Sequence, residues 1–149
     1  MPGGAIAVAS DHAGFDLKEI LKRDLQEAGH EVLDLGTNSS QSVDYPDFGA
    51  AMGDAVASGK AKRGVLVCGT GIGISIAANR NPKVRAALVH DVTSARLSRE
   101  HNDANVVAFG QRLIGLETAR EALKAFLATE FEGGRHIGRV AKLSKDCTT

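Results

Sequence analysis

The sequence contains little cysteine, no excess of either charge and no long apolar run. Only two cysteines, Cys68 and Cys147, occur in 149 residues, and they lie far apart. A disulfide-stabilised scaffold is therefore disfavoured, and both residues are expected to be free thiols. Basic and acidic side chains each number 18, so no overall field attracts nucleic acid or an anionic membrane. An anionic ligand would need a local cluster of cations.

The chain also shows none of the segments that direct proteins into membranes. No apolar run approaches the roughly 18 residues of a membrane span, and no cationic segment with an apolar stretch begins the sequence. We therefore expect a cytoplasmic protein that does not bind membranes. Low-complexity blocks and internal repeats are absent too, so residues 1–149 are predicted to form one domain.

Short apolar β-type segments alternate with amphipathic helical patterns along the chain. The expected strands are 5–10, 30–36, 64–69, 84–90 and 105–110. The expected helices are about 17–28, 46–59, 93–102 and 116–129. This alternation predicts a three-layer α/β/α Rossmann-like domain with a five-stranded parallel sheet, whose strand order the sequence does not determine.

Polar residues follow several of these strands, where ligands of parallel sheets usually bind. Asp11 and His12 follow the first strand, a loop with glycine at 69, 71 and 73 follows the third, and His90 and Asp91 follow the fourth. Cys68 stands at the start of the glycine loop. We therefore examined which chemistry a thiol at this position could serve.

The glycine loop after Cys68 fits none of the common cysteine or phosphate motifs. A phosphatase loop requires arginine at position 74, which is Ile74, and neither a Walker loop nor a dinucleotide fingerprint is present. Metal-binding spacings such as Cys-x-x-Cys are also missing. What remains is a thiol beside N–H groups that open a helix, which favours a nucleophile or a general base. A base next to oxyanion donors is suited to enolisation.

Each candidate also has a purely structural interpretation. Cys68 could be a small buried hydrophobe, and His12 could cap the first helix. His101 could interact only with a helix dipole, while Arg135 and Arg139 could form a solvated face. Tyr45 could be a packing ring. His30, His90 and His136 are interpreted as structural.

Several stretches taken together resemble one family, the B-type ribose-5-phosphate isomerases, which include allose- and galactose-6-phosphate isomerases. The similar stretches extend from residue 8 to about 140 and read "ASDHAGFDLK", "DYPDF", "CGTGIGISIAAN", "LSREHNDANVVAFGQR" and "EGGRHIGRV". One branch of the family has a glutamate where this chain has Ile74, and no cysteine before the loop. This sequence resembles the cysteine-containing branch.

The resemblance implies a role for each matching residue. Cys68 would be the base that moves a proton between C1 and C2, with Thr70 and Asp11 orienting it, and His101 would open the sugar ring. The loop backbone would hold the enediolate oxygen, and other side chains would hold the sugar hydroxyls and the phosphate. The implied substrate-binding residues are His12, Tyr45, Gly69, Gly71, Ile72, Gly73, Asn102, Arg112, Arg135 and Arg139.

We therefore expect an isomerase that interconverts ribose 5-phosphate and ribulose 5-phosphate through a cis-enediolate, without metal or other cofactor. The alternatives are a hexose 6-phosphate isomerase and, less favoured, a non-catalytic sugar-phosphate sensor. The resemblance also implies a homodimer or a dimer of dimers with sites between subunits. The C-terminal tail, about 131–149, would contribute Arg135 and Arg139 to the phosphate site.

Overall fold

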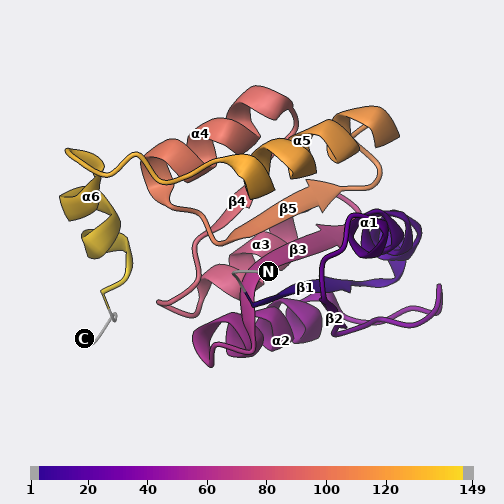
Figure 1. The fold of residues 1–149 in the computed structure, drawn as a ribbon. Helices are drawn as coiled ribbons and strands as arrows, with labels where there is room; N and C mark the ends of the chain where they lie inside the picture. Colours follow the sequence, from indigo (N-terminus) through magenta and orange to yellow (C-terminus); the bar gives the residue numbers. More distant parts are fainter. Residues whose placement is uncertain (1–3, 146–149) are drawn as a thin grey trace.

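A computed structural model describes residues 4–145 and confirms the predicted α/β/α architecture. All five strands are parallel, in the order β2-β1-β3-β5-β4, and helices cover both faces of the sheet (Figure 1). The strands are β1 (Ala5–Ser10), β2 (Val32–Asp34), β3 (Ala61–Cys68), β4 (Ala86–Leu88) and β5 (Val106–Gly110). The helices are the 3-10 helix η1 (His12–Gly14), α1 (Phe15–Glu27), α2 (Tyr45–Ala57), α3 (Ile72–Asn79), α4 (Val92–Asn102), α5 (Leu116–Ala128) and α6 (His136–Leu143).

Two apolar clusters, one on each face of the sheet, hold the layers together. Successive strand residues point to opposite faces, so Ile6 and Val8 of β1 belong to the cluster that includes α1, α4 and α5. Ala7 and Ala9 belong to the other cluster, with α2 and α3. The central strands are therefore apolar on both sides, which explains their continuous apolar sequences.

The structure corrects the predicted bounds at the sheet edges and near the C-terminus. The edge strands β2 and β4 have three residues each, and these are the residues that pair with β1 and β5. Helix α4 begins at Val92 rather than Thr93, since the Asp91 carboxylate accepts a hydrogen bond from Ser94 N at 2.6 Å. The expected tail contains α6, which packs against α4 (Figure 1). Cys147 lies outside the described residues.

None of the helices within residues 4–145 is long and apolar enough to cross a membrane.

Lys18 is a fully buried cation that holds the end of β2 against α1. Its Nζ donates to both Asp34 carboxylate oxygens, at 2.9 and 3.1 Å, and Lys22 Nζ donates to the same group at 2.9 Å. Burial acts to raise the pKa of Asp34, but hydrogen bonds from Lys22, Lys18 and the Gly36 N–H together lower it below its usual value. Asp34 therefore stabilises the fold as a carboxylate.

Asp34→Asn is expected to reduce the free energy of unfolding by about 3 kcal/mol at pH 7, because Lys18 would keep its buried charge without its nearest carboxylate. The lowered pKa in the folded state means that the stabilisation is present above the unfolded pKa of about 4 and is lost as the pH falls through the folded pKa. The difference in unfolding free energy between wild type and Asp34→Asn should therefore become smaller as the pH falls.

Urea unfolding at matched protein concentration measures this effect. The control is Asp24→Asn, whose half-exposed pair with Arg120 should contribute at most about 1 kcal/mol. Equal losses in the two variants, or a deficit for Asp34→Asn that does not change with pH, would contradict the stabilising role of the Lys18–Asp34 pair.

Candidate active site

A cleft of about 480 Å³ opens at the carboxyl ends of β1 and β3. The predicted site residues that line it are Asp11, His12, Tyr45, Cys68, Gly69, Thr70, Ile72, Gly73 and Arg112. Ala13 and Ile76 also line it, although the sequence analysis did not single them out. Ile76 is one helical turn after Ile72 on α3, and that spacing is the signal that could have identified it.

Cys68 ends β3 at the bottom of this cleft, where it is 5% exposed. Its Sγ accepts a hydrogen bond from the Gly71 N–H at 3.1 Å. Gly71 is the N-terminal cap of α3, so a backbone donor at the positive end of the helix points at the sulfur. Such a donor stabilises negative charge on the atom that it faces. The predicted arrangement of thiol and helix start is therefore present.

Glycine is required at position 71 by the backbone conformation and at positions 71 and 73 by close neighbours that leave no room for a Cβ. Gly71 has a φ of +77°, and a Cβ there would lie 2.6 Å from Leu88 Cδ1 and 2.8 Å from the Phe109 carbonyl carbon. A Cβ on Gly73 would lie 2.5 Å from the Tyr45 ring. The loop therefore keeps its backbone close to its neighbours, and the Tyr45 ring packs over it at the cleft wall.

Arg112 lines the cleft beside Gly69. A Cβ on Gly69 would meet the Arg112 guanidinium at 3.2 Å, so the lack of a side chain there lets the guanidinium lie against the loop. The backbone of Arg112 is anchored to the same loop, because its main-chain N–H donates to the Gly69 carbonyl at 3.0 Å. A permanent cation therefore lies beside the thiol-bearing loop, where it could bind an anionic group.

Asp11 and Thr70 lie in the cleft but have local hydrogen bonds. Asp11 Oδ1 accepts from the Gly14 N–H at 3.1 Å, which caps η1, and Thr70 Oγ1 accepts from the Ile72 N–H at 3.2 Å. Among the described residues, neither side chain forms a hydrogen bond with Cys68. Their proposed influence on the thiol would have to act through loop position and local charge.

His12 connects the cleft to the loop between β2 and α2. Its Nδ1 lies 3.1 Å from Val43 N and 3.2 Å from Val43 O, both within hydrogen-bonding distance. The Asp11 carboxylate, and not the His12 ring, caps η1. The structural interpretation of His12 as a helix cap is therefore wrong.

Four predicted site residues lie elsewhere, near the amino ends of the strands. His101 and Asn102 end α4, Arg135 caps α6 and Arg139 is within it. The end of α4 leads directly into β5, whose five residues span roughly 16 Å. Cys68 instead pairs with Gly110 at the far end of β5. One chain therefore does not bring His101 to Cys68.

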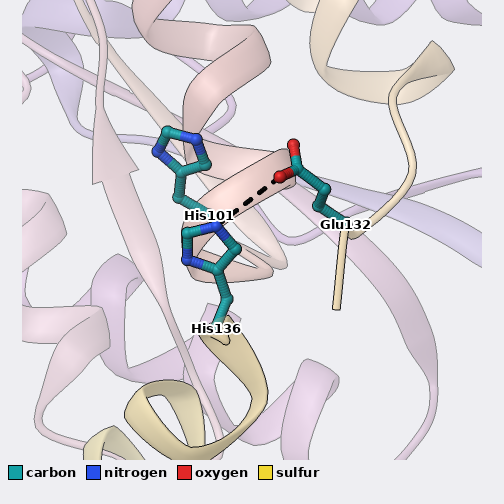
Figure 2. A group of neighbouring side chains, drawn as sticks. All are labelled: His101, Glu132 and His136. Atoms are coloured by element: carbon teal, nitrogen blue, oxygen red, sulfur yellow. Dashed lines mark ion pairs between the residues drawn. The ribbon is translucent and has the colours of Figure 1, made fainter. Parts of the chain in front are cut away.

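The His101 ring stacks on the ring of His136, with centroids 4.6 Å apart and 18° between the planes (Figure 2). His136 is 5% exposed, and the Glu132 carboxylate lies 3.7 Å from its Nε2. Burial lowers the pKa of His136, and the nearby His101, Arg135 and Arg139 lower it further against the opposing effect of Glu132. From the sequence alone, His136 is interpreted as a structural residue and Glu132 has no predicted role.

Comparison with known proteins places this architecture in one family. A model of the Ribose/Galactose Isomerase family matches residues 6–143. The chain is 48% identical over 139 residues to ribose-5-phosphate isomerase B of Escherichia coli, covering 93% of each protein. It superimposes on ribose-5-phosphate isomerase B of Clostridium thermocellum with a TM-score of 0.93 and 49% identity, covering 94% of this chain and 95% of the other.

A ribose 5-phosphate isomerase structure from Thermotoga maritima gives a TM-score of 0.92 at 49% identity, covering 95% of this chain and 97% of the other. The fold thus has close counterparts over nearly the whole chain. These matches confirm the resemblance drawn from the sequence: the chain belongs to the Ribose/Galactose Isomerase family and is an isomerase.

Proposed function

We propose that this protein interconverts ribose 5-phosphate and ribulose 5-phosphate, with Cys68 as the base. The observation that carries the proposal is the Cys68 thiol at the bottom of the cleft, with the Gly71 N–H directed at its sulfur and Arg112 beside the loop. The names of the similar proteins support the pentose phosphate as the substrate. Ile74 is fully buried, so position 74 offers no competing group to the cleft.

The proposed reaction is balanced without an added reactant. In the open-chain aldose, the Cys68 thiolate takes the proton from C2, the electron pair forms a C1–C2 double bond, and O1 becomes negatively charged. Backbone N–H groups of the glycine loop stabilise this enediolate. The thiol then returns the proton to C1, and the hydroxyl proton on O2 is transferred to O1. The ketose forms and the thiolate is regenerated.

A second copy of the chain completes the proposed site. His101, Asn102, Arg135 and Arg139 lie far from the cleft of their own chain, so they reach a Cys68 cleft only if the ends of α4 and α6 are inserted from a partner. Exposed apolar side chains at the cleft rim, on Tyr45, Ile72 and Ile76, support an interface there. A two-fold dimer would contain two equal sites.

In this dimer the phosphate group would be bound by Arg112 of one chain and by Arg135 and Arg139 of the other. Guanidinium groups suit this role because they donate two parallel hydrogen bonds to phosphate oxygens. Helix α6 gives the two arginines a fixed spacing, since Arg135 caps the helix and Arg139 follows about one turn later.

Arg135→Ala is therefore expected to raise KM for ribose 5-phosphate by roughly ten- to two-hundred-fold, with a smaller change in kcat, because a charge-assisted contact contributes about 1.5–3 kcal/mol. Steady-state kinetics measure the split, and Lys142→Ala, an exposed cation on the same helix, is the matched control. Inhibition by inorganic phosphate should weaken in Arg135→Ala. Equal phosphate inhibition of wild type and variant would show that the phosphate binds elsewhere.

The proposed activity is tested by proton NMR of the protein with ribose 5-phosphate in D₂O. Formation of ribulose 5-phosphate with solvent deuterium at C1 is expected, because a thiol proton exchanges with solvent. The hexose alternative follows from the family description, which also names galactose. We expect kcat/KM for ribose 5-phosphate to exceed that for allose or galactose 6-phosphate by at least about tenfold. The reverse order would overturn the pentose assignment.

A further inference from the structure

Three potential metal ligands gather beside α6, outside the Cys68 cleft of their own chain. His101 comes from the end of α4, Glu132 from the segment before α6, and His136 from the first turn of α6 (Figure 2). Their ligand atoms lie within 4.8 Å of one another. This is the only group of its kind found among residues 4–145.

The His136 ring carries an unsatisfied polar atom in this cluster. Its Nε2 is buried and has no hydrogen-bond partner within the described part of the chain. The Glu132 oxygen, at 3.7 Å, is too distant for a hydrogen bond. Buried nitrogen atoms are normally paired, and an unpaired one requires an explanation. The nitrogen faces the carboxylate, and the space between the two ligand atoms could hold an ion (Figure 2).

We propose that His101, Glu132 and His136 bind a divalent transition-metal ion such as Zn²⁺. Two imidazoles and one carboxylate form a known zinc-binding set that leaves a fourth position open. Imidazole ligands favour zinc, copper or nickel over magnesium and calcium, which prefer oxygen. The side chains must move to bind the ion, because tetrahedral ligands at 2.0–2.2 Å from zinc lie about 3.3 Å apart.

Binding would require all three side chains to move. The His101 and His136 rings must leave their stack, since the nitrogen lone pairs lie in the ring planes. Glu132 is 54% exposed and can move toward the nitrogens without disturbing the core. Arg135 and Arg139 lie nearby and oppose a cation. The site therefore binds its ion reversibly and not as a permanent structural metal.

Occupancy would inhibit the enzyme, a consequence that rests on the proposed function. The ion would be coordinated by a ring nitrogen of His101, so that nitrogen could no longer act in the proposed opening of the sugar ring. Turnover of ribose 5-phosphate should therefore fall when Zn²⁺ binds, and it should fall less in a variant that lacks Glu132. The metal site itself is independent of this consequence and is tested without any measurement of activity.

Calorimetric titration with Zn²⁺ tests the site in protein that carries Cys68→Ala and Cys147→Ala, so that no thiol competes for the metal. We expect one site per chain, no comparable binding of Mg²⁺, and a Kd at least about tenfold higher when Glu132→Gln is added. Glu130→Gln, an exposed carboxylate two residues away, is the matched control and should change nothing. Equal affinities in the Glu132 and Glu130 variants would overturn the proposal.

NMR of the five histidine side chains identifies the ligands directly. On addition of Zn²⁺, the ring signals of His101 and His136 should shift while those of His30 and His90, which belong to neither group of site residues, stay in place. Shifts confined to the other three histidines would overturn the proposal. If the metal binds as expected but turnover of ribose 5-phosphate is unaffected, the metal site stands and the ring-opening role of His101 fails.

Discussion

Cys68→Ala is expected to lower turnover of ribose 5-phosphate by about 10²–10⁴-fold or more, because a positioned base contributes an acceleration of that size. Substrate affinity should change little, since the proposed phosphate and hydroxyl contacts come from other residues. The substitution removes one hydrogen bond to the Gly71 N–H, but the close packing of Gly71 against Leu88 and Phe109 remains, so we expect the loop to keep its backbone path. The variant should therefore bind substrate almost as well as wild type while its turnover is largely lost.

Calorimetry with ribose 5-phosphate and turnover assays on the same preparation measure this divergence. Cys147→Ala is the control and should retain full activity. If Cys68→Ala loses binding together with turnover, the cysteine supports the structure of the loop and is not the base. Unchanged turnover would remove it from the mechanism.

His101→Asn is expected to affect the two directions unequally. Ribose 5-phosphate is mostly a closed furanose that must be opened before proton transfer. Ribulose 5-phosphate cannot form that ring, because its C5 oxygen carries the phosphate. We expect turnover from the aldose to fall by about 10²-fold or more and turnover from the ketose to fall much less. The aldose product can leave in its open form and close in solution.

Initial rates in both directions, at matched saturation, measure this difference between the aldose and the ketose. The fixed overall equilibrium constant allows unequal losses, because the variant can release open-chain aldose, which is a different species from the furanose. An equal loss in the two directions would show that His101 shapes the site or the subunit contact instead of opening the ring. His90→Asn is a suitable control, because His90 is exposed and outside both groups of site residues.

Much of the fold could be predicted because its signals are local. The continuous apolar segments of β1, β3 and β5 identify the central strands, which are buried on both faces. Parallel strands also end at a common edge, so the polar residues after β1 and β3 were expected to meet. That expectation placed Asp11, His12 and Cys68 in one cleft, where the structure has them.

The rest depends on contacts between distant parts of the chain. The lengths of edge strands β2 and β4 depend on how many of their residues pair with β1 and β5, and the apolar pattern of an edge segment does not reveal that number. Helix α6 packs against α4, and the stacking of His136 on His101 depends on that packing. The distance from His101 to Cys68 follows from the path of β5, and a contact with a second copy leaves no periodic signal in the sequence.

The proposal that each active site combines Cys68 of one chain with His101 of another can be tested by mixing two inactive variants. Chains carrying Cys68→Ala are refolded with an equal amount of chains carrying His101→Asn, and turnover of ribose 5-phosphate is measured. Random pairing makes half of the dimers mixed, and one of the two sites in each mixed dimer has both residues intact. Recovery of about one quarter of wild-type activity is therefore expected. Activity no greater than that of the two variants measured separately would contradict it.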